Sequence, residues 1–137
     1  MRLLIDLNIL LDVIQRREPF YEASAAVLSK VLRQEAAGYL PGHSLTTLYY
    51  FVKKYAGRER ADEVVDWMLA TLEVIPEGKP LLRFARTLAF SDFEDAVVAS
   101  AAAAAGCDRI VTRNVADFTR SPIRAVTPDE PLAETVP

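Results

Sequence analysis

The sequence contains one cysteine, Cys107, and one histidine, His43, among 137 residues. A single cysteine excludes an internal disulfide, and two such residues are too few for a zinc site, which takes three or four ligands. Basic residues are outnumbered too, with 16 Lys+Arg against 19 Asp+Glu and a net charge of −3. This excludes a module that binds nucleic acid through bulk positive charge, so such contact would need a local basic cluster or a bound cation.

Long apolar runs, internal repeats and linkers are absent as well. The most apolar later stretch, 96–105, is too short to span a bilayer, and Asp6 interrupts the apolar run at the N-terminus. We therefore expect no signal peptide, no membrane association and a cytoplasmic location. Hydrophobic residues make up 51% and charged residues 26%, which is typical of a globular protein and predicts a single domain over residues 1–137.

Short apolar runs alternate with amphipathic segments along the chain. We predict strands at 2–5, 39–40, 72–75, 109–111 and 124–126, and helices at about 8–15, 20–36, 44–55, 60–71, 81–88 and 91–105. Gly38 is expected to follow the end of the second helix. Strands that alternate with helices indicate a parallel sheet covered on both faces. The predicted fold class is α/β, a three-layer α/β/α sandwich with a central parallel sheet of four to five strands.

Four groups of polar residues fall at one edge of this predicted sheet. Because the carboxyl ends of parallel strands meet at the edge where ligands bind, we expect their side chains to converge. Clustered carboxylates repel one another unless a cation neutralises them, and oxygen ligands favour Mg²⁺ or Mn²⁺, which promote displacement at phosphorus. The groups are Asp6 after the first strand, Ser44 and Thr47 after the second, Asp92, Glu94 and Asp95 before the fourth, and Thr112, Asn114 and Asp117 after it.

Structural explanations compete with these assignments. Ser91, Asp92 and Glu94 fit a capping box in which Ser91 caps the helix and Glu94 reaches back, with Asp92 favoured by the positive helix end. Capping does not explain Asp95, which lies one turn inside the helix. For Asp92, the capping and functional explanations both stay open.

Structural explanations also exist for several other polar residues. Asn8 fits either a helix cap or a group that orients Asp6, while Asn114 and Asp117 favour turns by themselves. Asp12 is expected to be an exposed charge on a helix, and His43 an ordinary loop histidine. One basic cluster fits either a solvated helix surface or an RNA contact, and comprises Lys53, Lys54, Arg58 and Arg60.

Four segments in order resemble the motifs of PIN-domain proteins. The resemblance extends from residue 6 to residue 118 and implies a metal-dependent ribonuclease fold, many of whose small members are VapC-type toxins of toxin–antitoxin pairs. The segments are 6–12 (D-L-N-I-L-L-D), 44–47 (S-L-T-T), 92–96 (D-F-E-D-A) and 110–118 (I-V-T-R-N-V-A-D-F).

The resemblance also implies roles for individual residues and partners. It implies Mg²⁺ or Mn²⁺ as cofactor, an RNA substrate, an antitoxin protein as partner, and a homodimer. The catalytic and metal-binding residues that it implies are Asp6, Asp92, Asp95 and Asp117. The orienting residues that it implies are Asn8, Ser44, Thr112 and Asn114. For the ribonuclease reaction we also expect Arg113 to contact a phosphate of the substrate.

Two positions depart from the family pattern. The glutamate six residues after the serine of the second motif is replaced by Tyr50, and the acidic residue after Thr-Arg is replaced by Asn114. The acidic set is thus incomplete. The sequence predicts a metal-dependent endoribonuclease, the toxin of a toxin–antitoxin pair; the alternative is a catalytically weakened PIN-like module that binds RNA or protein.

Two further classes with acidic residues at a sheet edge fit less well. A phosphoacceptor receiver domain needs an aspartate at the end of a central strand, but the third strand ends Val74-Ile75-Pro76. A haloacid-dehalogenase-type phosphatase needs D-x-D after the first strand, where this chain has Asp6-Leu7-Asn8.

Overall fold

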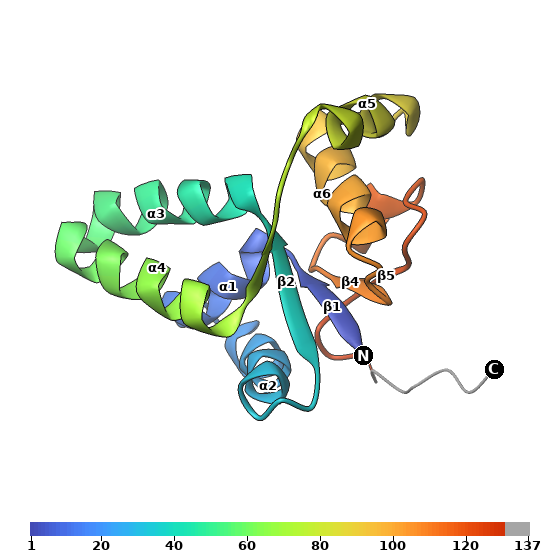
Figure 1. The fold of residues 1–137 in the computed structure, drawn as a ribbon. Coiled ribbons are helices and arrows are strands. Elements are labelled where there is room, and N and C mark those ends of the chain that lie inside the picture. The colour runs from blue at the N-terminus through green and yellow to red at the C-terminus, as the bar shows by residue number, and fades with distance from the viewer. Residues whose placement is uncertain (131–137) are drawn as a thin grey trace.

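Five parallel strands form the centre of the structure, a computed structural model that describes residues 1–130 (Figure 1). Their order across the sheet is β3-β2-β1-β4-β5, so β1 lies in the middle. The end of the predicted domain, 131–137, lies outside the described residues. The strands are β1 (Arg2–Ile5), β2 (Ala37–Pro41), β3 (Glu73–Ile75), β4 (Arg109–Val111) and β5 (Ala125–Val126).

Helices cover both faces of this sheet, which confirms the predicted α/β/α sandwich. One face carries α1 (Leu7–Ile14), α2 (Tyr21–Leu32), α3 (Gly42–Ala56) and α4 (Arg58–Thr71). The other face carries α5 (Lys79–Thr87), α6 (Phe93–Ala104) and the 3₁₀ helix η1 (Val115–Phe118).

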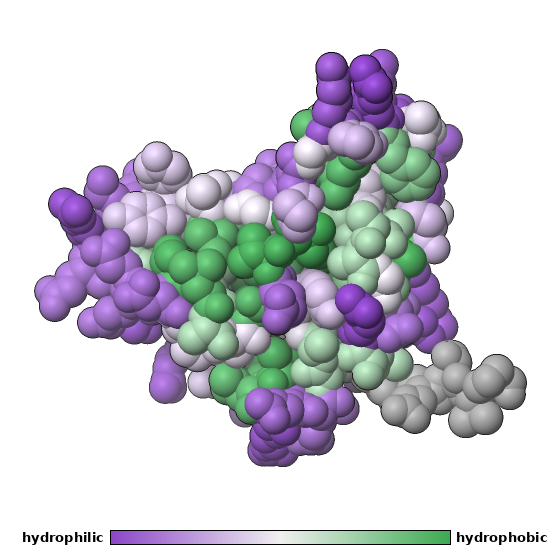
Figure 2. Space-filling view, in the orientation of Figure 1, coloured by the Kyte–Doolittle hydropathy of each residue, from purple (hydrophilic) through white to green (hydrophobic). Residues whose placement is uncertain are grey.

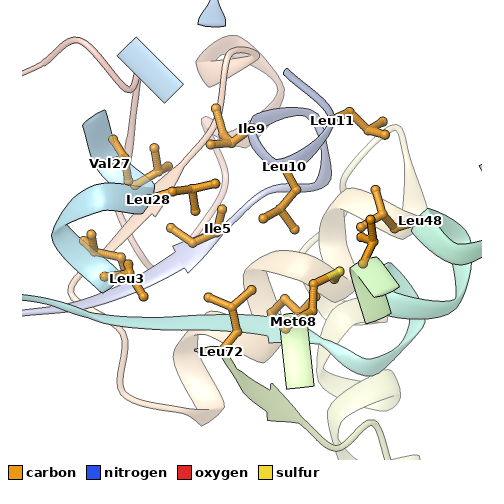
Figure 3. Close-up of a cluster of buried hydrophobic side chains, with 14 of the residues drawn as sticks. Leu3, Ile5, Ile9, Leu10, Leu11, Val27, Leu28, Leu48, Met68 and Leu72 are labelled. Atoms are coloured by element: carbon orange, nitrogen blue, oxygen red, sulfur yellow. The ribbon is translucent and has the colours of Figure 1, made fainter. Parts of the chain in front are cut away.

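The side chains of β1 divide between the two faces because successive residues of a strand point to opposite sides. Leu3 and Ile5 join the core beneath α1–α4, which Figure 3 shows with its leucine, isoleucine and valine side chains pointing inward. Leu4 packs on the opposite face with α6. Each of the three is fully buried, and such burial stabilises the fold by about 1.5–3 kcal/mol per side chain.

The alanine-rich run predicted as a helix is α6. Its small side chains, including Ala99 and Ala102, are buried against Leu4 and Ile110 of the sheet. Because alanine projects little beyond the backbone, the helix can lie close to the strands.

The second predicted helix ends early, at Leu32 rather than near residue 36. The chain turns at Gln34, whose φ of 61° lies in the left-handed region, and β2 begins at Ala37. The expectation that Gly38 follows a helix end is therefore wrong. Gly38 lies inside β2, where a Cβ atom would approach Leu72 Cδ2 to 2.6 Å, so glycine lets this strand pack against Leu72.

The remaining predicted helices and strands are present close to their predicted boundaries. Figure 2 shows hydrophilic side chains over the outer end of the α3–α4 pair and over α5, with hydrophobic residues gathered between them. Within residues 1–130, no helix is both long and apolar enough to cross a membrane.

Candidate functional site

Asp6 stands directly after β1, at the carboxyl edge of the sheet. Its Oδ1 accepts a hydrogen bond from Leu7 N at 2.8 Å, so Asp6 is the N-cap of α1. Asn8 lies inside the helix, and its Nδ2 donates to Asp6 Oδ2 at 3.4 Å. Of the two readings of Asn8, the helix cap is thus wrong, and its contact is with Asp6.

Thr112, at the end of the neighbouring strand, binds the carboxylate of Asp6. It follows β4, is fully buried, and donates from Oγ1 to Asp6 Oδ2 at 2.7 Å. The hydroxyl also accepts from Asn114 N at 3.0 Å, which fixes the loop after β4 relative to Asp6. Burial raises the pKa of Asp6 above its usual value, and the hydrogen bond from Thr112 opposes that rise.

Asp92 occupies the N-cap position of α6. Its Oδ1 accepts from Glu94 N at 2.8 Å and from Asp95 N at 3.4 Å. The predicted capping box with Ser91 as cap is therefore wrong by one residue. An aspartate is a strong N-cap, and its charge is favoured by the positive end of the helix, which explains why it takes this place.

Burial and the negative charges of neighbouring carboxylates act on Asp95 and raise its pKa. Its pKa is raised to about 6, first by burial and then by the negative charges of Asp92, Asp6 and Asp117, with Glu94 last. Acidic residues from three separate segments of the sequence thus lie close enough to disfavour ionisation of one carboxyl group.

A pocket of about 260 Å³ opens beside Asp95. Three predicted site residues line it, and Arg120 adds a cation that the sequence analysis did not select. The sequence could have indicated Arg120, because it lies three residues after Asp117 in the same loop. We call this site the acidic pocket; its lining is Phe90, Ser91, Asp92, Asp95, Ala116, Asp117, Thr119 and Arg120.

The donor chemistry of this region fits a hard divalent cation. Asp6, Asp92, Asp95 and Asp117 offer only oxygen atoms, and the buried Oδ1 of Asn8 has no hydrogen-bond partner within residues 1–130. In that same range, no three His, Cys, Asp or Glu side chains are grouped closely enough to enclose an ion. This arrangement suits Mg²⁺, which keeps several waters and needs only one or two protein carboxylates.

Asp12 contradicts the expectation of an exposed charge, because it is fully buried. Its Oδ2 accepts from Arg113 Nε at 2.8 Å and from Ser24 Oγ at 3.1 Å. Arg113 also lies over the ring of Phe20, with its guanidinium carbon 4.1 Å from the ring centre. Its positive charge opposes the rise in the pKa of Asp6, so Arg113 lies near the acidic residues as well.

The remaining predicted residues do not line the acidic pocket. Ser44 is buried in the first turn of α3, and its orienting role stays a prediction. Tyr50, at the position of the family glutamate, is 69% exposed. His43 is not a loop residue: it belongs to the first turn of α3, where its backbone N and Nδ1 contact the Glu77 carboxylate at 2.6 and 2.8 Å.

Solved structures share this fold. VapBC2 from Rickettsia felis, bound to a DNA fragment from its promoter, matches with a TM-score of 0.70 and 22% identity over 93% of this chain and 98% of that chain. DNA-bound VapBC from Salmonella typhimurium matches with a TM-score of 0.71 and 21% identity at the same coverage. A toxin–antitoxin complex from Klebsiella pneumoniae matches with a TM-score of 0.72 and 22% identity, also over 93% and 98%.

Sequence comparison gives the family. No match was found among curated proteins. A family model for the PIN domain matches residues 2–116, which include β1 through β4 and the first part of η1. Asp6, Asp92, Asp95 and Asn114 fall within the matched residues, and Asp117 lies just beyond them. The match spans most of the chain, so the protein belongs to the PIN domain family.

Proposed function

We propose that this protein is a divalent-metal-dependent endoribonuclease and the toxin of a toxin–antitoxin pair. The observation that carries the proposal is the convergence of Asp92, Asp6 and Asp117 on Asp95, whose pKa rises to about 6. Such repulsion is costly in a metal-free protein and is relieved by a bound cation, so it is typical of a metal site rather than of a structural cluster.

The residues have distinct parts in this proposal. Asp6 and Asp95 hold the principal ion, and Asp92 and Asp117 contribute from the acidic pocket, directly or through water. When bound, the divalent ion lowers the pKa of a water molecule and neutralises charge that develops on the phosphodiester. Magnesium and manganese both suit oxygen donors of this kind.

Two other side chains prepare the site for the reaction. Thr112 fixes the orientation of the Asp6 carboxylate through its 2.7 Å hydrogen bond. Arg120 lines the acidic pocket, and an arginine there can donate to a phosphate oxygen. Arg113 is committed through Nε to Asp12, and its predicted phosphate contact would use its terminal nitrogens.

The partner in this proposal is an antitoxin protein. The solved VapBC structures, which are named as complexes bound to DNA, support it through a common fold. The proposal also includes a homodimer, which the family resemblance implies, and a cytoplasmic location, which the sequence led us to expect. A small open reading frame next to the gene, whose product co-purifies with this chain, would be the expected finding.

The test combines cleavage with a binding measurement that does not depend on activity. Labelled RNA is incubated with the protein across a Mg²⁺ or Mn²⁺ titration and in chelator, and melting curves are recorded in the same buffers. We expect metal-dependent cleavage and a rise in melting temperature, since a ligand of the folded state stabilises it. Asp6→Asn and Asp95→Asn should each remove most of both effects.

Asp66→Asn is the matched control, because Asp66 is an exposed aspartate on α4 and the substitution changes the same charge. It should retain cleavage and the thermal response. A metal response that persists unchanged in both site variants would contradict the assignment of Asp6 and Asp95 as metal ligands. RNA binding without any cleavage or metal response would favour the alternative, a catalytically weakened binding module.

A further inference from the structure

The guanidinium group of Arg113 is held by residues from two helices. Asp12 of α1 is fully buried, and its Oδ2 accepts a hydrogen bond from Arg113 Nε at 2.8 Å. The ring of Phe20, at the start of α2, lies against the same group, with the guanidinium carbon 4.1 Å from the ring centre. A hydrogen bond from Nε and contact with a ring face together restrict both the position and the tilt of the planar guanidinium group.

The first turn of α2 is arranged around this contact. Ser24 is fully buried and donates from Oγ to Asp12 Oδ2 at 3.1 Å, the same oxygen that Arg113 binds. Ser24 N also donates to Phe20 O at 3.1 Å, and residues four apart lie on one side of a helix. The hydroxyl group and the ring therefore act together on one side of α2. We call Asp12, Phe20 and Ser24 the Arg113 support.

The ion pair between Arg113 and Asp12 uses only part of the guanidinium group. An arginine and a carboxylate make their strongest contact through two parallel hydrogen bonds to both carboxylate oxygens. Here the contact joins Nε to Oδ2, while the buried Oδ1 of Asp12 has no hydrogen-bond partner within residues 1–130. A buried oxygen without a partner is unfavourable. The arrangement thus forgoes a hydrogen bond inside the protein and leaves the terminal nitrogens of Arg113 outside the ion pair.

Arg113 is also close to the acidic residues and open to solvent. It directly follows Thr112, whose Oγ1 donates to Asp6 Oδ2 at 2.7 Å. Its positive charge opposes the rise in the pKa of Asp6. Its side chain is 23% exposed, so the guanidinium group is held without being enclosed. A phosphate that approaches a cation beside Asp6 would therefore meet an arginine whose orientation is already fixed.

We propose that Asp12, Phe20 and Ser24 are positioning residues, which fix the Arg113 guanidinium group for contact with a phosphate of the RNA substrate. This inference rests on the proposed ribonuclease function and on the phosphate contact expected of Arg113. An arginine that is ordered before the substrate arrives loses less conformational entropy on binding, and its donors already point to where charge develops. The three residues act through Arg113 and do not themselves touch the substrate.

A purely structural tie between α1, α2 and the segment after β4 is the competing explanation. It accounts for the burial of Asp12, but it gives no reason for the unpartnered Oδ1 or for a ring that is 39% exposed at Phe20. The two explanations differ in a measurable way. A structural tie affects the protein whatever residue stands at position 113, whereas a positioning effect on RNA disappears once Arg113 is replaced.

A double-mutant cycle on cleavage and binding tests the inference. For the full chain, kcat/KM is measured with labelled RNA in Mg²⁺, and affinity for the same RNA by fluorescence anisotropy in chelator. Phe20→Leu should lower both quantities about fivefold, the size of one cation–π contact. Phe20→Tyr keeps a ring and should match the unmodified protein. Arg113→Lys keeps the charge without the planar fork, and should lower both at least about tenfold. In the Arg113→Lys protein, Phe20→Leu should change neither by more than about twofold.

Ser24→Ala removes a hydrogen bond to the oxygen that holds Arg113, and should act in the same direction as Phe20→Leu. Both controls come from α2. Tyr21→Leu removes the next ring, which lies over Arg16 with 5.3 Å between the guanidinium carbon and the ring centre. Ser29→Ala removes a partly exposed hydroxyl group. Neither control should change kcat/KM or affinity.

The melting temperature adds a measurement that does not depend on activity. Because the Arg113 support does not hold the ion, Phe20→Leu should keep the full rise in melting temperature on addition of Mg²⁺. The melting curves also set the assay temperature below the midpoint of the least stable variant, so that every protein compared is folded.

Two results would overturn the inference. One is an equal loss on Phe20→Leu in the unmodified and the Arg113→Lys proteins, or an equal loss on Tyr21→Leu. The other is metal-dependent cleavage that neither Phe20→Leu nor Arg113→Lys reduces, which would leave the proposed function in place. RNA affinity that depends on Phe20 only while Arg113 is present, in a protein that cleaves no RNA under any metal condition, would support the inference and contradict only the proposed catalysis.

Discussion

Arg113 donates from Nε to Asp12 Oδ2 across 2.8 Å, although 101 positions separate the two residues in the chain. The contact ties the segment after β4 to the second turn of α1, and Asp12 is fully buried. A buried ion pair gives little net stability over an apolar pair of the same shape. Removal of one partner is different, because it leaves a polar or charged group uncompensated in a low dielectric.

Breaking this pair should therefore be strongly destabilising. We expect Arg113→Met, which leaves Asp12 without its cation, to lower the free energy of unfolding by about 3 kcal/mol. Arg113→Met combined with Asp12→Leu should recover part of that loss. Urea unfolding of the two single variants and the double variant measures the coupling. Arg33→Met, at an exposed ion pair, is the control and should change stability by less than about 0.5 kcal/mol. Additive effects of the two substitutions would contradict a coupled pair.

Asp12 was wrongly predicted to be exposed, and the reason shows what the sequence alone does not reveal. In α1, Ile9, Leu10, Leu11 and Asp12 are all buried, so no polar face marks the aspartate as different from a surface charge. Its burial depends on Arg113, and a contact between such distant residues leaves no local pattern. Asp6, in contrast, directly follows an apolar run that is typical of a buried parallel strand, so its place at the sheet edge was predictable.

The same distinction applies to the fold. The strands were found because they are short apolar runs between helices, and their order of appearance restricts the topology. The end of α2 was misplaced because alanines at 36 and 37 are compatible with a helix. The chain leaves the helix after Leu32 and turns at Gln34, and Gly38 packs against Leu72 inside β2, a contact that only the assembled sheet reveals.

The repulsion around Asp95 makes stability depend on pH. Its pKa is about 6 in the folded protein, above the usual 3.8, so the folded state binds more protons than the unfolded state between these values. Unfolding free energy in chelator should therefore fall as pH rises through this window, and level off above it. Asp95→Asn removes the effect, so its advantage over the unmodified protein should be larger at about pH 7.5 than at about pH 4.

Melting curves at several pH values, with Asp66→Asn as the charge-matched control, measure this difference. Asp6, whose pKa is raised in the same direction, adds a pH dependence that persists in the Asp95 variant. A large loss of stability in Asp95→Asn at every pH would instead give Asp95 a structural role.

Ser100 offers a test of packing in α6. It is 2% exposed, and its Oγ has no hydrogen-bond partner within residues 1–130. A buried hydroxyl without a partner costs free energy, and alanine is the better helix former. Ser100→Ala should therefore raise stability by about 1 kcal/mol, read as a higher urea midpoint with an unchanged slope. Ser29→Ala, in the partly exposed part of α2, is the comparison and should change little. A loss of stability in Ser100→Ala would mean that the hydroxyl is satisfied after all.

Asn114 stands where the family pattern has an acidic residue. Its backbone N is bound to Thr112 Oγ1 at 3.0 Å, and Thr112 in turn holds Asp6. The side chain is exposed at the start of η1. As a helix cap, asparagine and aspartate are nearly equivalent, so their exchange isolates the effect of charge at this position.

Asn114→Asp should tighten Mg²⁺ or Mn²⁺ binding, because hard cations bind a charged oxygen more strongly than a neutral one. In chelator the same substitution should lower the melting temperature, since one more carboxylate joins Asp6 and Asp117. Calorimetric metal titration measures the first effect and melting curves measure the second. Added salt should reduce the melting difference if its origin is charge repulsion between exposed groups. Equal metal affinities together with equal melting temperatures would place Asn114 outside the metal site, and would leave Asp117 as the acidic group that this loop contributes.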